Sequence, residues 1–136
     1  MSKKSEIRDQ IKELNLPAIV LEIFDGHIDD PTLGFYCKDP YYSLSSNSGY
    51  PPELLPLWEC GIIVTSYSKV TGKFILFDLE APDDYIRADI DFKTLVEDIL
   101  ILMWEAEEPD EYLRDLASKF LYDSIDALLI KLETEN

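Results

Sequence analysis

The sequence is poor in the residues that most often build metal and catalytic centres. It contains one histidine, His27, and two cysteines, Cys37 and Cys60, among 136 residues. A single histidine excludes a two-histidine metal site, and the two cysteines lack the spacing of metal ligands. No glycine-rich loop for binding phosphate occurs either. We therefore expect no metal, no cofactor and no enzymatic activity.

Long hydrophobic runs are also missing. No apolar stretch approaches the roughly 18 residues that a membrane-spanning helix requires. The chain starts with a charged amphipathic pattern instead of an apolar signal segment. We expect a soluble cytoplasmic protein without a membrane partner. In a reducing compartment its two thiols stay free, and Cys60 is expected to be a small buried hydrophobic residue.

Basic residues are scarce as well, with 12 lysines and arginines against 28 acids and a net charge of −16. The imbalance is uneven along the chain. Residues 1–77 carry 10 acidic and 7 basic side chains, whereas residues 78–136 carry 18 acidic and 5 basic ones. Such a charge repels nucleic acid and accelerates the encounter with a basic protein. Two interpretations stay open: a solvated surface that only aids solubility, and a binding face for a basic partner.

The chain is nevertheless rich in apolar residues, which make up 46% of it. At this length we expect one domain, residues 1–136, with its own core. Residues 62–67 and 73–79 are rich in β-branched and aromatic residues and predict two strands. Gly72 can take the positive φ of a hairpin turn between them, and residues 85–90 predict a weaker third strand. The large aromatic residues expected in the core are Trp58, Tyr67, Phe74 and Phe77.

Helical patterns lie on both sides of these strands. Residues 18–24 fit either a strand or a helix, and we favour a helix because Pro17 suits a helix start and Gly26 a helix stop. Residues 26–56 are rich in Gly, Pro, Ser, Asn and Asp, and we expect them to be irregular. The other helical patterns cover residues 4–14, residues 92–107, a segment that begins at Pro109, and a segment that begins at Ile125.

The central stretch resembles a known superfamily. The residues that carry the resemblance are YPP (50–52), PLWECG (56–61), IVTSY (63–67) and GKFI (72–75). This pattern resembles the SUKH superfamily, which includes many bacterial immunity proteins and fungal regulators of cell-wall synthesis. The similarity covers roughly residues 50–100. Upstream, Leu16-Pro17 fits the family pattern, while Asp25-Gly26 stands where the family often has Asn-Gly.

The resemblance implies an α+β fold, with a small, mostly antiparallel sheet packed against N-terminal and C-terminal helices. It also implies a protein that binds and neutralises a cognate toxin. A basic toxin that attacks nucleic acid would fit the charge of this chain, with carboxylates taking the place of substrate phosphates. Tyr85 and Tyr112 would be aromatic anchors within an acidic rim. The predicted partner-binding residues are Asp83, Asp84, Tyr85, Glu105, Glu107, Glu108, Asp110, Glu111 and Tyr112.

Other interpretations stay open. Tyr85 could simply begin a strand, and residues 107–111 could be a solvated junction between helices. The main alternative function is a non-enzymatic adaptor or regulator that binds a cellular protein or a small ligand. An acidic mimic of DNA is a further possibility, and an enzyme would have only Cys60, His27 and an aspartate as a polar cluster. The oligomeric state is left open.

Overall fold

The computed structural model of the chain describes residues 3–45 and 49–135. Its described residues form seven helices and one four-stranded antiparallel sheet, which confirms the predicted α+β class. The chain divides into two compact units, Met1–Ile90 (unit 1) and Asp91–Asn136 (unit 2), and each is described by itself. The expectation of a single domain over the whole chain stays a prediction.

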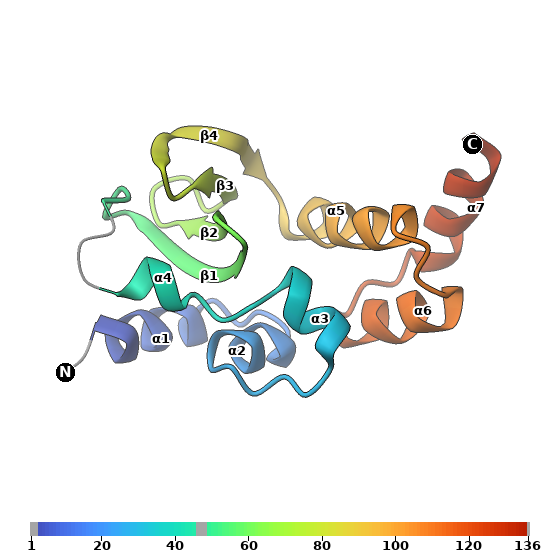
Figure 1. Cartoon of the computed structure of the whole chain (residues 1–136), viewed down its shortest axis with the longest axis horizontal. Coiled ribbons are helices and arrows are strands. Elements are labelled where there is room, and N and C mark those ends of the chain that lie inside the picture. Colours follow the sequence, from blue (N-terminus) through green and yellow to red (C-terminus); the bar gives the residue numbers. More distant parts are fainter. Residues whose placement is uncertain (1–2, 46–48, 136) are drawn as a thin grey trace. The chain divides into compact units, whose positions relative to one another are not determined.

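Unit 1 contains four helices and the whole sheet. The strand order is β1-β2-β3-β4, so each strand pairs with its neighbour in sequence. All four helices contact β1, and Figure 1 shows α1 and α2 on the β1 side, away from β4. The elements are α1 (Lys3–Glu13), α2 (Ala18–Phe24), α3 (Pro31–Tyr36), α4 (Tyr41–Leu44), β1 (Leu54–Cys60), β2 (Ile63–Ser68), β3 (Phe74–Asp78) and β4 (Ala81–Ile90).

The β2–β3 hairpin is the predicted one. Val64 lies opposite Phe77, and both belong to a buried cluster with Leu54 and Ile75. This pairing places the apolar residues of neighbouring strands on the same face, as period-two alternation requires. Of the four aromatic residues expected in the core, Trp58, Phe74 and Phe77 are buried, and Tyr67 is half-buried.

The helix over residues 18–24 is confirmed, but the expectation of an irregular segment over residues 26–56 is wrong for nearly half of its described part. α3 forms there because the Asp30 side chain accepts hydrogen bonds from the Thr32 and Leu33 N–H groups, at 2.9 and 3.3 Å. Pro31 follows as the first residue of the helix, the position that proline favours. α4 and the start of β1 occupy more of this segment, while residues 46–48 lie outside the described part.

The sequence did not predict β1. β1 begins at Leu54 and contains Pro56, a residue that the interior of a sheet normally rejects. The proline is tolerated because β1 lies at the end of the strand order and its register shifts between Pro56 and Trp58. β4 is also longer than predicted, and nearly all of its residues are exposed.

Unit 2 consists of three helices: α5 (Phe92–Glu105), α6 (Asp110–Lys119) and α7 (Ile125–Glu135). α5 packs against α6, and α6 packs against α7. The Asp91 side chain caps α5 by accepting a hydrogen bond from the Thr94 N–H at 2.8 Å. The predicted apolar stripe is largely buried, and α5 ends earlier than predicted, before Glu107 with its φ of 66°.

Candidate interaction surface

The outer edge of β1 is covered by the segment that follows α3. Lys38 and Glu59 exchange two backbone hydrogen bonds, of 2.8 and 2.7 Å, and form an isolated antiparallel bridge. The same strand pairs with β2 on its other side, where Cys60 lies opposite Ile63. β1 is therefore held along both edges near its end, which removes a free strand edge at this position.

The Glu59 side chain secures the same segment. Glu59 is 1% exposed, and its carboxylate accepts hydrogen bonds from the Ser43 N–H at 2.6 Å and the Tyr42 N–H at 3.3 Å. The Ser43 hydroxyl donates a third hydrogen bond to it. A buried carboxylate is tolerated when donors satisfy it in this way. Glu59 thus caps α4 and ties it to β1.

The Trp-Glu-Cys-Gly sequence therefore has a structural role at each position. Trp58 is buried, Glu59 caps α4, Cys60 ends the strand, and Gly61 takes a φ of 61° in the turn to β2. The sequence did not identify Glu59 as important. The one signal for it was an acid between Trp58 and Cys60 in an otherwise apolar run.

The first group of predicted partner-binding residues, Asp83, Asp84 and Tyr85, lies on β4 of unit 1. All three are exposed, and Tyr85 keeps 37% of its surface open to solvent. Partial burial raises the pKa of the Tyr85 hydroxyl, and the charges of Glu53, Asp83 and Asp89 raise it further. Glu53 and Asp89 thus belong to the same acidic environment, although the sequence did not single them out.

The second group lies at the junction of α5 and α6 in unit 2. Glu105, Glu107, Asp110 and Glu111 are exposed, while Glu108 and Tyr112 are half-buried. The turn itself is held by backbone hydrogen bonds from the Glu107 N–H to the Trp104 carbonyl, at 2.9 Å, and from the Glu108 N–H to the Met103 carbonyl, at 3.0 Å. These two bonds form a Schellman motif. We call the residues 105–112 the acidic turn.

Part of the acidic turn also has a local structural explanation. Asp110 and Glu111 lie in the first turn of α6, where negative charge is favoured by the helix dipole. The cations of α6 are directed to other carboxylates, because Lys119 pairs with Asp115 at 3.2 Å and Arg114 pairs with Asp126. The structure brings residues together within each group. That the two groups form one binding face stays a prediction.

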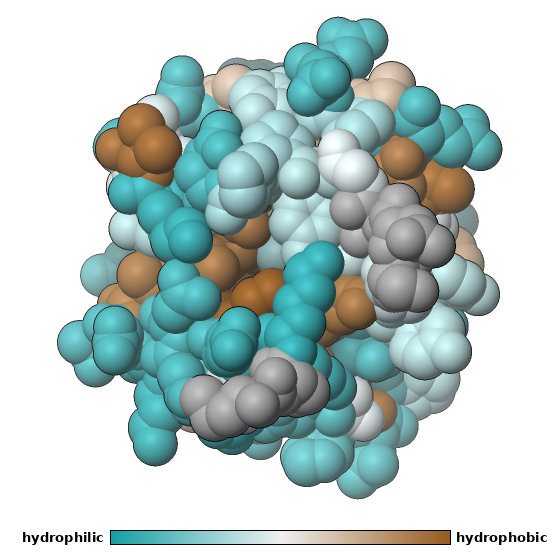
Figure 2. All heavy atoms as spheres, turned by 90° about the vertical axis from the view of Figure 1, so that its left-hand side faces the viewer, coloured by the Kyte–Doolittle hydropathy of each residue, from teal (hydrophilic) through white to brown (hydrophobic). Residues whose placement is uncertain are grey.

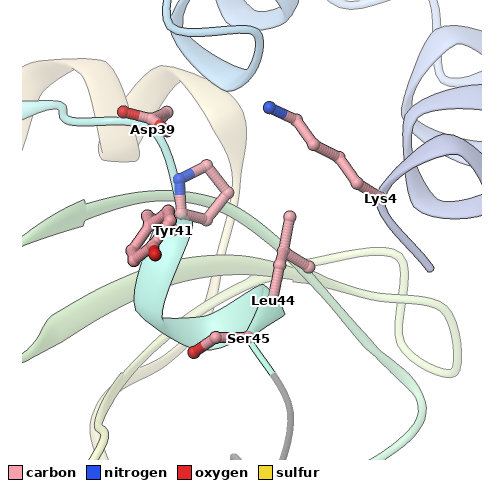
Figure 3. A pocket seen from close by; sticks show the side chains of 6 residues that line it. Lys4, Asp39, Tyr41, Leu44 and Ser45 are labelled. Carbon is pink, nitrogen blue, oxygen red and sulfur yellow. The ribbon is translucent and has the colours of Figure 1, made fainter. Parts of the chain in front are cut away.

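Unit 1 also has small pockets. One of about 220 Å³ is lined by Lys4, Asp39, Pro40, Tyr41, Leu44 and Ser45. Figure 3 shows Lys4 extending from α1 on one side, opposite the residues of the α4 segment. The face in Figure 2 is mostly hydrophilic, with apolar atoms gathered in a recess near its middle. The volume of the pocket beside Lys4 is below the roughly 300–1,000 Å³ that is typical of small-molecule sites.

Two further findings apply to the part of the chain that the structure describes. Among residues 3–45 and 49–135, no group of three His, Cys, Asp or Glu side chains is placed to hold a metal ion. Within the same residues, every helix is too short or too polar to cross a membrane. Comparisons of the chain with protein-family models, with curated proteins and with solved structures gave no match.

Proposed function

We propose that this chain is an immunity-type protein of a bacterial cytoplasm that binds and neutralises a cognate toxin. The observation that carries this proposal is the density of exposed carboxylates at the acidic turn. Unit 2 as a whole has 13 acidic and 4 basic side chains. The resemblance of roughly residues 50–100 to the SUKH superfamily supports the same function.

The electrostatics favour a basic protein as the partner. A concentrated negative surface attracts a positive cleft over about one Debye length, roughly 8 Å at physiological salt, and speeds association. Nucleases and other toxins that act on nucleic acid need such a cleft to hold phosphates. The carboxylates of the acidic turn would occupy it in place of the substrate, so inhibition would be by occlusion. Tyr112, which is half-buried beside these acids, would supply apolar contact.

The state of the thiols supports a function other than catalysis. Burial raises the pKa of Cys37 and of Cys60 above the ordinary thiol value. A catalytic cysteine needs the opposite change, because the thiolate is the nucleophile. We therefore propose that the protein acts by binding and is not an enzyme.

The first experiment is capture of partners by the tagged chain from a lysate of its own cells, washed at low and high salt. The expected result is one basic protein that survives the high-salt wash. That protein, expressed alone, should arrest growth, and co-expression of this chain should restore it. A captured protein without toxicity would refute the immunity function, and a set of basic proteins lost at high salt would indicate generic charge attraction.

A matched pair of variants tests the acidic turn. The double variant Glu107→Lys/Glu108→Lys should slow association with the captured partner by about tenfold or more, since charge near an interface mainly changes the on-rate. The control, Glu133→Lys/Glu135→Lys, changes the net charge by the same amount at exposed positions of α7. Association rates measured for both across a salt series check the prediction. Equal slowing by the two variants would mean that net charge acts and the acidic turn is not the contact.

The alternative of a regulator that binds a small ligand is supported by one feature. The pocket of Figure 3 combines a cation, Lys4, with the acid Asp39 and the ring of Tyr41. A zwitterionic metabolite would suit such a lining. Substituting Lys4 by Ala would abolish that function and leave toxin binding intact, which separates the two proposals.

A further inference from the structure

The register beside β1 places the two cysteines opposite each other. The Lys38 N–H donates to the Glu59 carbonyl, and the Glu59 N–H donates to the Lys38 carbonyl. Such an exchange defines a hydrogen-bonded pair of an antiparallel ladder, and the next pair along the ladder is a non-hydrogen-bonded one. The bridge is isolated; the residues at the next position beside it are Cys37, which precedes Lys38, and Cys60, which follows Glu59.

The residues of the bridge show where the two cysteines lie. The Lys38 ammonium group lies 5.9 Å from the centroid of the Tyr42 ring, and the Glu59 carboxylate accepts a hydrogen bond from the Tyr42 N–H. Both side chains therefore leave the ladder on the same side. Cys37 is the C-cap of α3, with a φ of −134° and a ψ of 75°, and Cys60 is the last residue of β1. Each cysteine is the chain neighbour of a bridge residue, so the two lie next to each other beside the bridge.

The separation suits a covalent bond. Residues of a non-hydrogen-bonded antiparallel pair have Cα atoms about 4.5 Å apart, and disulfides span Cα separations of about 4.4 to 6.8 Å. After burial, the second cause that raises the pKa of Cys37 is the charge of Cys60, which requires the two sulfurs to be close. Both are free thiols in the structure.

One of the two cysteines is accessible to a small reagent. Cys60 is half-buried, which corrects the expectation that it is fully buried, because it lies at the end of β1 beside the turn. Cys37 is buried, but it lines a pocket of about 120 Å³. An oxidant can therefore reach Cys60 first, and the neighbouring sulfur of Cys37 can complete the reaction.

We propose that Cys37 and Cys60 form a reversible intramolecular disulfide when the protein meets a small-molecule disulfide such as oxidised glutathione. Because burial raises the pKa of Cys60, only a small fraction of it is thiolate and the reaction is slow. That thiolate attacks the oxidant, forms a mixed disulfide and releases one glutathione thiolate. The Cys37 thiolate then attacks the Cys60 sulfur and displaces the second. The two electrons pass from the cysteine sulfurs to the oxidant, and the two cysteine protons pass to the released thiolates.

The disulfide would restrain the α4 segment, which the Glu59 side chain also ties to β1. It would close a ring over residues 37–60, which contains α4 and the bridge to β1. A covalent link of this kind restricts the unfolded chain and raises stability. Oxidation is therefore expected to slow proteolysis within residues 38–53 and to raise the unfolding temperature, and reduction by dithiothreitol should reverse both changes.

The test treats the folded full-length chain with oxidised glutathione and analyses it by intact mass and by peptide mapping without reduction. The expected product is monomeric, has lost two hydrogen atoms, and yields one cross-linked peptide pair that contains Cys37 and Cys60. Cys60→Ser, at a half-buried position, is the matched control and should form no such product. Its proteolysis rate should be the same before and after oxidation.

Three results would overturn the proposal. One is a mixed disulfide on Cys60 that persists while Cys37 stays a thiol. Another is a disulfide between two chains, visible as a dimer without reduction. The third is a pair of thiols that stay unreacted in the folded protein but react after unfolding in urea, which would mean that the folded register keeps them apart.

Discussion

The two compact units are stabilised in different ways. In unit 1 the interior contains polar side chains, namely Ser43, Glu59, Thr65, Ser66 and Ser68, beside its apolar core. The best example is Glu59, whose hydrogen-bond partner Ser43 lies 16 residues away in sequence. Unit 1 therefore combines its apolar core with specific buried polar contacts, and the contact of Glu59 joins two segments that are distant in sequence.

In the described part of unit 2, buried residues are apolar except for the hydroxyl of Tyr122. Its helices follow each other and pack in chain order. Of its 46 residues, 17 are charged, with a net charge of −9, whereas the 90 residues of unit 1 have a net charge of −7. A core made of apolar helix faces leaves the outer positions free to vary. This difference explains why unit 2 can concentrate negative charge.

The largest effect that tests this comparison is expected from Glu59→Ala. The substitution removes the acceptor of the buried Ser43 N–H and of the partly buried Tyr42 N–H. Hydrogen bonds to a charged group contribute about 1.5 to 3 kcal/mol each. We expect a loss of about 3 kcal/mol or more in the free energy of unfolding. Urea denaturation followed by the fluorescence of Trp58, in a Trp104→Phe background, would report on unit 1.

Two further variants make this experiment specific. Glu80→Ala removes an equal charge from an exposed position of unit 1 and should change stability by less than about 0.5 kcal/mol. Glu59→Gln keeps the shape and one carbonyl acceptor, so its loss should lie between the two. If Glu59→Ala were as mild as Glu80→Ala, the polar contacts of unit 1 would not be what holds the α4 segment.

In unit 2 the polar contact to compare with that of Glu59 is the hydrogen bond of Tyr122. The Tyr122 hydroxyl, in the segment between α6 and α7, donates to the Glu97 carboxylate of α5 at 2.5 Å. Tyr122→Phe removes the bond but keeps the buried ring, so we expect a loss of about 1 kcal/mol, smaller than that of Glu59→Ala. Denaturation of the two variants under the same conditions measures the contrast.

This contact also predicts a dependence on pH. Burial, and then the hydrogen bond to Glu97, raise the pKa of Tyr122 above its ordinary value of 10.0. A raised pKa in the folded state means that its stabilising contribution is complete below about pH 10 and is lost as the pH rises above that value. Above about pH 10 the wild type should thus lose stability faster than Tyr122→Phe. An equal loss of stability with rising pH in the two proteins would contradict the assignment of this pH dependence to Tyr122.

The same contrast explains how much of the fold could be predicted from the sequence. The helices of unit 2 and the β2–β3 hairpin follow from local periodicity and from local signals such as Asp91 and Gly72. α3, with six residues, is too short for a periodic signal, although Asp30-Pro31 is a recognisable helix start. α4 depends on Glu59, and no pattern near residues 41–44 indicates it.

The candidate surface, like the fold, could be predicted from the sequence only in part. Composition identified acids that the structure shows to be exposed at the acidic turn, because charged residues are rarely buried. It did not associate Glu53 with Tyr85, which are brought together only by the folding of the sheet. The pairing of Cys37 with Cys60 depends on the bridge between Lys38 and Glu59. Contacts of this kind are set by register between distant segments, which a single sequence does not reveal.

The smallest effect is expected at the ends of helices, where the units differ again. The residue after the C-cap of α2 in unit 1 is Gly26, at a φ of 73°, while the residue after the C-cap of α6 in unit 2 is Leu121, at a φ of 56°. A left-handed conformation is unfavourable for leucine, and the Leu121 side chain is 77% exposed, so little burial compensates for it. Leu121→Gly should therefore raise the free energy of unfolding by about 0.5 kcal/mol.

Leu121→Ala is the matched control for this last prediction, because it removes the same exposed side chain but keeps the Cβ atom. It should bring no gain, and Gly26→Ala in unit 1 should destabilise, since it introduces a Cβ at the same kind of position. Thermal and urea denaturation of the three variants measure these changes. A loss of stability in Leu121→Gly would mean that the leucine side chain makes a stabilising contact. That contact would then offset the unfavourable left-handed conformation of Leu121.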